Sequence, residues 1–255
     1  DLSADQQRLI GRRIWLNEGK GQVEYLTHWN VGEKFASMGI GHFIWYPAGA
    51  PGQYVESFPK LAAYLAAHGR ALPDWTQGPC PWDSREDFFA DYDSPRLSAL
   101  RELLAQPEML SLQTRFIIDR LEAALPAVLE ASPPAQSAAV EARFRQVLSH
   151  PVGAYALIDY VNFKGEGTAK TERYPDEDGV GWGLLQALQL MDPRPGQRPN
   201  DAFADGAQSA LERRVRNTPP PPERQRQEQK WLAGWQQRLD PYRAGSLQDL
   251  VPDFR

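Results

Sequence analysis

Glu18 is the residue best placed to do chemistry, because it stands where a helical pattern ends at Gly19. Apolar residues at three- and four-residue spacing predict this helix, and Ser3 with Gln6 predicts a capping box at its start. A run of β-type residues interrupted by glycines follows from Phe35 to Tyr46. A carboxyl group at a helix end, beside an aromatic-rich hairpin, suits acid catalysis on sugars if burial raises its pKa.

The position of Glu18 allows two interpretations. Trp15 precedes it by three residues on the same predicted helical face and could form an apolar wall. The helix dipole disfavours an acid at a C-terminus, so the placement is unusual for a residue that serves stability alone. The alternative is a solvated glutamate at a helix end.

Two stretches around this acid, Asn17-Glu18-Gly19 and the hairpin sequence FASMGIGHF from Phe35 to Phe43, resemble the phage-type lysozymes. In that family a glutamate ends the first helix, and a hairpin follows that reads aromatic-x-Thr-x-Gly-x-Gly-His. The resemblance implies that Glu18 is the catalytic acid and that Ser37 takes the place of the threonine. The structural signature of the hairpin would consist of Gly39, Gly41 and His42.

The chain departs from this family at the second carboxylate. Phage-type lysozymes place an aspartate between the glutamate and the threonine, but no aspartate lies between Glu18 and Ser37. Glu33 is the only carboxylate just before the hairpin besides Glu24, and chitosanases of the same superfamily also use a longer spacing. Glu33 could act as base or position a water in an inverting hydrolysis, which needs carboxyl groups roughly 6.5–9.5 Å apart. The alternative is a plain turn residue in Gly32-Glu33-Lys34.

Aromatic and polar residues elsewhere are candidates for sugar binding. Tryptophan and tyrosine rings suit stacking on sugars, and Trp29, Trp45 and Tyr46 lie at the predicted hairpin. The segment 156–163 resembles the buried central helix of the lysozyme large lobe. This resemblance implies that Glu166 lies near the cleft, opposite Glu18, and that Gln186 lies in the helix that follows. Each of these side chains could instead serve packing.

The rest of the chain predicts a mostly helical α+β protein with two lobes, and the resemblance implies that this is a lysozyme-like two-lobed fold in a single domain over residues 1–255. We expect a small β-containing lobe over about 19–56 and a helical lobe over about 57–255 that includes a C-terminal helical extension. The apolar segment 151–163 is expected to be the buried central helix. Residues 192–204 are expected to form a loop, and 207–216 and 222–239 to form charged surface helices.

Composition excludes several classes of function. No apolar run has the length of a membrane span. The net charge is −5 without a cluster of basic residues, which argues against nucleic-acid binding. The single Cys80 excludes an intramolecular disulfide and a thiolate metal cluster. The histidines show no metal-ligand spacing, and the acidic segment 176–179 lacks the ordered ligands of a calcium loop, so we expect neither metal nor cofactor.

These observations together predict a muramidase that cleaves the β-1,4 glycan strands of peptidoglycan, with Glu18 as general acid. The alternatives are a lytic transglycosylase that uses Glu18 alone, a chitosanase-like hydrolase, and an inactive glycan-binding module of the same fold. In a transglycosylase an internal sugar hydroxyl replaces water, so one acid suffices. Peptidoglycan lies outside the cytoplasm, so we expect a periplasmic or secreted protein whose signal peptide has been removed.

Overall fold

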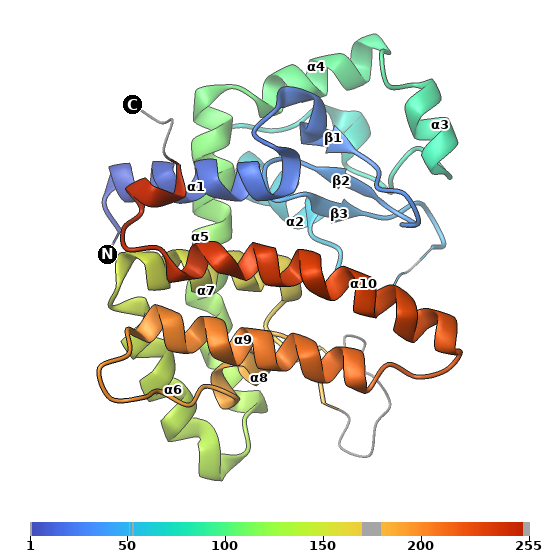
Figure 1. Cartoon of the computed structure of the whole chain (residues 1–255). Coiled ribbons are helices and arrows are strands. Elements are labelled where there is room, and N and C mark those ends of the chain that lie inside the picture. The colour runs from blue at the N-terminus through green and yellow to red at the C-terminus, as the bar shows by residue number, and fades with distance from the viewer. Residues whose placement is uncertain (1, 51, 53, 170–179, 252–255) are drawn as a thin grey trace. The chain divides into compact units, whose positions relative to one another are not determined.

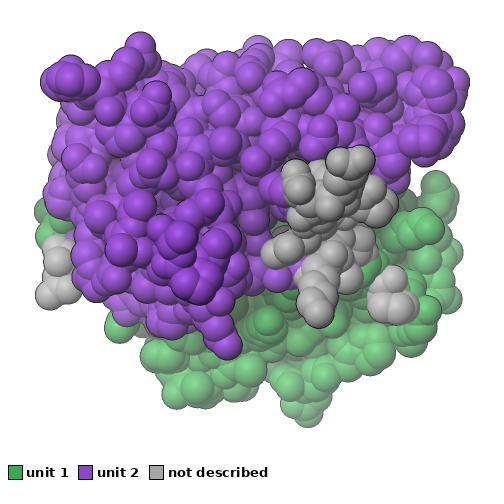
Figure 2. All heavy atoms as spheres, turned by 90° about the horizontal axis from the view of Figure 1, so that it is seen from below, with its two compact units in different colours: residues 1, 3–117 green, residues 2, 118–255 purple. Residues whose placement is uncertain are grey.

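A computed structural model describes residues 2–50, 52, 54–169 and 180–251 (Figure 1). It is 64% helical with one three-stranded antiparallel sheet, which confirms the α+β, mostly α class. The chain forms two compact units, residues 3–117 and residues 118–255, with Leu2 grouped with the second (Figure 2). The predicted lobe boundary near residue 56 lies inside the first unit and stays a prediction. The acidic segment 176–179 lies outside the described residues.

The first unit contains the sheet. Helix α1 (Ala4–Gly19) leads through a short 3-10 turn (Val23–Leu26) into β1 (Thr27–His28). Strands β2 (Ala36–Met38) and β3 (Phe43–Trp45) form the hairpin, and β2 lies between the other two. Ser37 faces His28 on one side and Ile44 on the other in this antiparallel register. Figure 1 shows the three short arrows side by side.

Four helices complete the part of the first unit that the model describes. They are α2 (Phe58–Ala67), α3 (Arg85–Ala90), α4 (Pro95–Leu104) and the first turns of α5 (Pro107–Ala131). The side chains of Ser84 and Ser94 accept hydrogen bonds from the backbone at the starts of α3 and α4, as N-cap residues do.

The second unit is built around α7 (Pro151–Lys164), in which every residue from Val152 to Val161 is buried. This confirms the predicted central helix. Around it pack α6 (Pro134–Leu148), α8 (Leu184–Gln189), α9 (Pro199–Arg216) and α10 (Pro222–Leu239). Helices α9 and α10 run side by side in Figure 1. Two 3-10 turns, Asp240–Arg243 and Gln248–Leu250, follow them.

Helix α9 corrects two expectations from the sequence. Residues 199–204 are helical and not loop, because Pro199 occupies the first helical turn, where its missing N–H costs nothing. The helix is also largely buried, since ten of its residues are inaccessible. Small residues allow this close packing: a Cβ on Gly206 would lie 2.4 Å from the carbonyl oxygen of Ala187 in α8. The expectation of a charged surface helix was wrong because the charged side chains occupy only one face of α9.

None of the helices in the described part of the chain is long and apolar enough to cross a membrane.

Candidate active site

Glu18 lies in the last turn of α1 and is partly exposed. The helix ends as predicted at Gly19, after which Lys20 adopts a left-handed conformation with φ 54°. The indole N–H of Trp15 donates to the carbonyl of Gln22 at 3.2 Å and thus fixes the loop that leaves the helix. The Trp15 ring is 8% exposed and faces Gly19, whose Cβ would lie 3.3 Å from it. The helix terminus that carries Glu18 is therefore tightly held.

Glu33 ends a tight turn that starts at Asn30. The Glu33 N–H donates to the Asn30 carbonyl at 3.3 Å, and Gly32 has a φ of 83°, as the third position of a type II turn requires. The indole N–H of Trp29 donates to the Glu33 carbonyl at 2.9 Å. The side-chain amide of Asn30 donates to Glu33 Oε2 at 3.0 Å. Hydrogen bonds thus restrain both the backbone and one carboxylate oxygen of Glu33.

The two glutamates act on each other electrostatically. Burial raises the pKa of Glu33 above its usual value, the Asn30 hydrogen bond opposes this rise, and the negative charge of Glu18 adds to it. The charge of Glu18 is the smallest of these three influences on the pKa of Glu33. The structure therefore places the acid at the helix end within electrostatic range of the acid before the hairpin.

Tyr46 completes this neighbourhood at the end of the hairpin. Its side chain is 7% exposed, and burial raises its pKa to about 12. The charge of Glu33 is one of the smaller contributions that raise it further. The hydroxyl oxygen has no hydrogen-bond partner of normal geometry among the described residues.

The hairpin turn is held by Gln113 of α5, which sequence reasoning missed. Gln113 is completely buried, and its Oε1 accepts a hydrogen bond from the Ile40 N–H at 3.0 Å. Its Nε2 donates to the carbonyls of Leu104 and Met109 at 2.9 and 3.1 Å. Gly39 allows this approach, because it has a φ of 74° and its Cβ would lie 2.3 Å from Gln113 Oε1. Asn30 was missed as well, since an asparagine two residues before a glycine indicates only a turn.

The contacts of His42 are those of a residue that stabilises the fold. It adopts a left-handed φ of 46°, and its Nε2 hydrogen-bonds the Tyr25 carbonyl at 2.9 Å. Its ring stacks on His28 with centroids 6.0 Å apart. Burial, followed by the charges of His42, Arg85 and Lys20, lowers the pKa of His28 to about 4. His28 is therefore uncharged at neutral pH, which suits the stacked contact of its ring with His42.

Four of the predicted catalytic and sugar-binding residues in the first unit are buried, namely Trp29, Ser37, Trp45 and Tyr46. Trp29 and Trp45 are 1% and 0% exposed, and their rings pack against Phe88 and Phe58. Neither ring offers an accessible face to a sugar, because both serve the aromatic core. Ser37 is 1% exposed in the central strand. Its expected catalytic role has no support from accessibility and stays a prediction.

The two predicted residues of the second unit have different settings. Gln186 is 4% exposed, and its amide accepts from the Gly183 N–H at 2.9 Å and donates to the Gly167 carbonyl at 3.0 Å. It therefore closes the start of α8 and is not exposed for sugar binding. Glu166 is partly exposed in the loop after α7, and its backbone carbonyl accepts from the Leu185 N–H at 2.9 Å. Its expected place opposite Glu18 stays a prediction.

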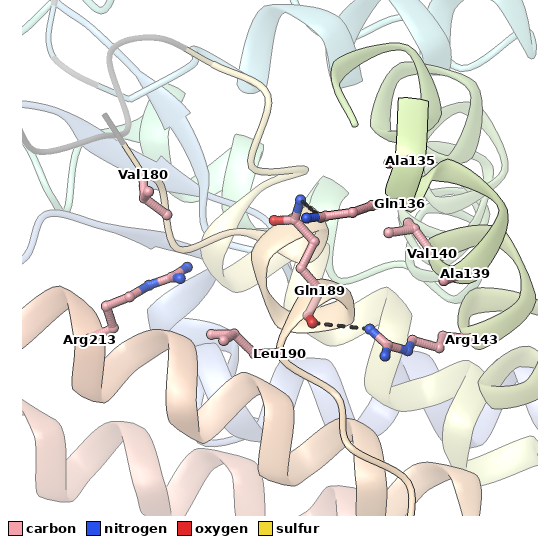
Figure 3. Close-up of a pocket in the computed structure, with 9 residues that line it drawn as sticks. All are labelled: Ala135, Gln136, Ala139, Val140, Arg143, Val180, Gln189, Leu190 and Arg213. Atoms are coloured by element: carbon pink, nitrogen blue, oxygen red, sulfur yellow. Dashed lines mark hydrogen bonds between the residues drawn. The ribbon is translucent and has the colours of Figure 1, made fainter. Parts of the chain in front are cut away.

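A pocket of about 460 Å³ lies elsewhere in the second unit, between α6, the end of α8 and α9 (Figure 3). Arg143 donates from Nη1 to the carbonyls of Leu188 and Gln189, and Gln189 donates to Gln136. None of the residues expected to bind or cleave a sugar lines this pocket. Across the described ranges, no group of three or more His, Cys, Asp or Glu side chains could hold a metal ion.

Comparison with known proteins adds no assignment: no family model, no curated protein and no solved structure matches the chain.

Proposed function

We propose that the chain hydrolyses the β-1,4 bonds of peptidoglycan glycan strands or of a related amino-sugar polymer. The reacting groups are Glu18 and Glu33, and the fold is the lysozyme-like two-lobed one that the hairpin sequence resembles. The observation that supports this best is the Glu33 carboxyl itself, which Trp29 and Asn30 hold at the turn before the hairpin and whose pKa is raised by burial and by the charge of Glu18. A pair of carboxyls flanking the bond is what most glycoside hydrolases use.

The environments of the two acids support a division of roles. A general acid must hold its proton near neutral pH, and its partner must be ionised. Burial and the charge of Glu18 both favour the protonated form of Glu33. We therefore assign the role of general acid to Glu33 and the role of general base to Glu18, which reverses the roles that the resemblance implied.

The reaction then proceeds as an inverting hydrolysis. The Glu33 carboxyl gives its proton to the glycosidic oxygen while the bond from that oxygen to the anomeric carbon breaks. The Glu18 carboxylate accepts a proton from the water that attacks the anomeric carbon from the opposite face. The two carboxyls exchange their protonation states, and a proton returns through solvent. In the alternative, Glu18 gives its proton to the glycosidic oxygen and Glu33 accepts the proton from the attacking water.

The other candidate functions differ in whether they require Glu18, Glu33 or both. A lytic transglycosylase needs one acid only, so Glu33 would be dispensable. An inactive glycan-binding module would need neither carboxyl group. The chemistry of a chitosanase would be the same and the substrate would differ. Cleavage of peptidoglycan takes place outside the cytoplasm, so a periplasmic or secreted location belongs to this proposal.

Purified cell walls and soluble chitosan are the substrates with which to test the proposal. Wild-type protein should lower the turbidity of cell walls or shorten chitosan, and Glu18→Gln and Glu33→Gln should do neither. Glu24→Gln is the matched control, because Glu24 lies between the two in sequence and is exposed. Mass spectrometry should find new reducing ends. Anhydromuramic ends would indicate a transglycosylase, and equal clearing by all four proteins would refute the carboxyl pair.

A further inference from the structure

The pocket between α6, the end of α8 and α9 carries positive charge on two of its walls. Arg143 of α6 and Arg213 of α9 both line it. Figure 3 shows their guanidinium groups approaching from opposite sides, with the end of α8 between them. None of the described residues that line the pocket has a carboxylate side chain. Guanidinium groups stay charged and repel one another, so an anion between these two is stabilised by both.

The Arg143 side chain is fixed by the helix end that it contacts. Its Nη1 donates to the Leu188 and Gln189 carbonyls at 2.8 and 3.0 Å, at the C-terminus of α8, where a positive charge is favoured. These bonds use two of the five N–H groups of the guanidinium. The other three, on Nε and Nη2, donate to none of the described residues. Arg143 therefore caps α8 with one nitrogen and offers the fork of Nε and Nη2 to a further acceptor.

The rest of the pocket wall is mostly apolar and consists of Ala135, Ala139, Val140, Val180 and Leu190. The side-chain amides of Gln189 and Gln136 are hydrogen-bonded to each other at 2.8 Å. The volume of about 460 Å³ lies within the range of small-molecule sites, which is about 300–1,000 Å³. Such sites combine an apolar lining with a few polar groups that orient the ligand. Here the orienting groups are the two guanidinium groups.

We propose that this pocket binds an organic acid, whose carboxylate lies between Arg143 and Arg213 and whose hydrocarbon part packs on the apolar wall. The planar guanidinium fork matches the two oxygens of a carboxylate, and such charge-assisted pairs are stronger than neutral hydrogen bonds. A phosphate ion would meet the same charges but would leave the apolar wall uncovered. Neither Glu18 nor Glu33 lines the pocket, so this binding does not depend on the proposed function.

Hexanoate and hexanamide are the probes that test the chemistry of the ligand, because they share a hydrocarbon chain and differ in the charged group. Calorimetric titration of the full chain should give saturable binding of hexanoate with a Kd of about 1 mM. Hexanamide should bind at least about tenfold more weakly, since it lacks the charge-assisted hydrogen bonds. Inorganic phosphate should also bind more weakly than hexanoate. Equal binding of hexanamide, tighter binding of phosphate, or no saturable binding of hexanoate would overturn the proposal.

NMR with ¹⁵N-labelled protein locates the bound probe. Hexanoate should shift the amide signals of residues 135–143 and 188–190, which form two walls of the pocket. Shifts confined to other parts of the chain would place the acid elsewhere and refute the assignment of this pocket.

Replacing each arginine tests its contribution. Arg143→Gln and Arg213→Gln should each weaken hexanoate binding about tenfold or more, as for the loss of a hydrogen bond to a charged group. Because Arg143 also holds the end of α8, Arg213→Gln on the opposite wall tests the site with that contact intact. Arg145→Gln is the matched control, since Arg145 is an exposed residue of α6 that pairs with Glu141. Wild-type affinity in Arg143→Gln or Arg213→Gln, or an equal loss in Arg145→Gln, would contradict the proposal.

Discussion

Replacing Gln113 with leucine should loosen the hairpin that carries the candidate site. Leucine has a similar volume, so the change removes hydrogen bonds and leaves no large cavity. It leaves the Ile40 N–H and the Leu104 carbonyl without the partners they have at 3.0 and 2.9 Å. The Met109 carbonyl lies within α5 and keeps its helical hydrogen bond. At about 1–3 kcal/mol for each buried unsatisfied group, the expected loss is about 3 kcal/mol.

Urea unfolding and amide hydrogen exchange measure this effect. The free energy of unfolding should fall by that amount, and exchange should accelerate at the backbone amides of residues 36–45. Gln146→Leu is the control, because Gln146 is an exposed helical glutamine and should change stability by no more than about 0.5 kcal/mol. A loss below about 1 kcal/mol in Gln113→Leu, with unchanged exchange in the hairpin, would refute the reasoning.

Three further predictions concern Glu33 and the buried Asp159. In an NMR titration the Glu33 carboxyl should show a pKa above its usual value. This pKa should be lower in Glu18→Gln, because the negative charge of Glu18 is removed. An identical Glu33 titration in both proteins would contradict the electrostatic coupling. Because the pKa of Glu33 is raised in the folded state, this residue contributes stability at low pH that is lost as pH rises through that pKa. In thermal melts Glu33→Gln should therefore become more stable than wild type as the pH approaches neutrality. Asp159, which is 0% exposed, binds Arg238 at 2.9 Å and Tyr242 at 2.7 Å, so Asp159→Asn should cost about 3–5 kcal/mol in urea unfolding. Glu223→Gln breaks the exposed pair with Arg226 and should cost less than about 1 kcal/mol; similar losses in the two variants would be incompatible with this account.

Local signals in the sequence predicted the elements well where the partners lie within a few residues. The capping box of Ser3 and Gln6 forms as expected, and α1 ends at Gly19. The apolar segment after Pro151 becomes the buried helix α7. Such features depend on hydrogen bonds and periodicity inside one element, which the sequence displays directly.

Contacts between distant residues were beyond sequence reasoning. Gln113 reaches Ile40 across 73 positions, and a glutamine in an amphipathic helix gives no sign of a buried partner. Trp29 and Trp45 were expected to be exposed at a sugar site, yet they pack with Phe88 and Phe58 into the core. Aromatic side chains suit both roles, and only the fold decides between them.

Only part of the candidate site could be predicted from the sequence. Glu18 and Glu33 could be chosen as carboxylates near the hairpin, but the desolvation of Glu33 follows from the turn at Gly32 and from Trp29. Our proposal exchanges the roles of the two acids for this reason, since a sequence shows which residues are acids and not which of them is desolvated.

The rate of reducing-end release from purified glycan strands, compared among wild type, Glu18→Gln, Glu33→Gln and the double variant, tests the carboxyl pair most directly. General acid–base groups contribute about 10²- to 10⁴-fold, so each single variant should lose at least about 100-fold. Because groups that act as a unit are not additive, the double variant should be little worse than either single one. If the wild-type protein releases reducing ends and either single variant retains the full rate, the pair is not the reaction centre.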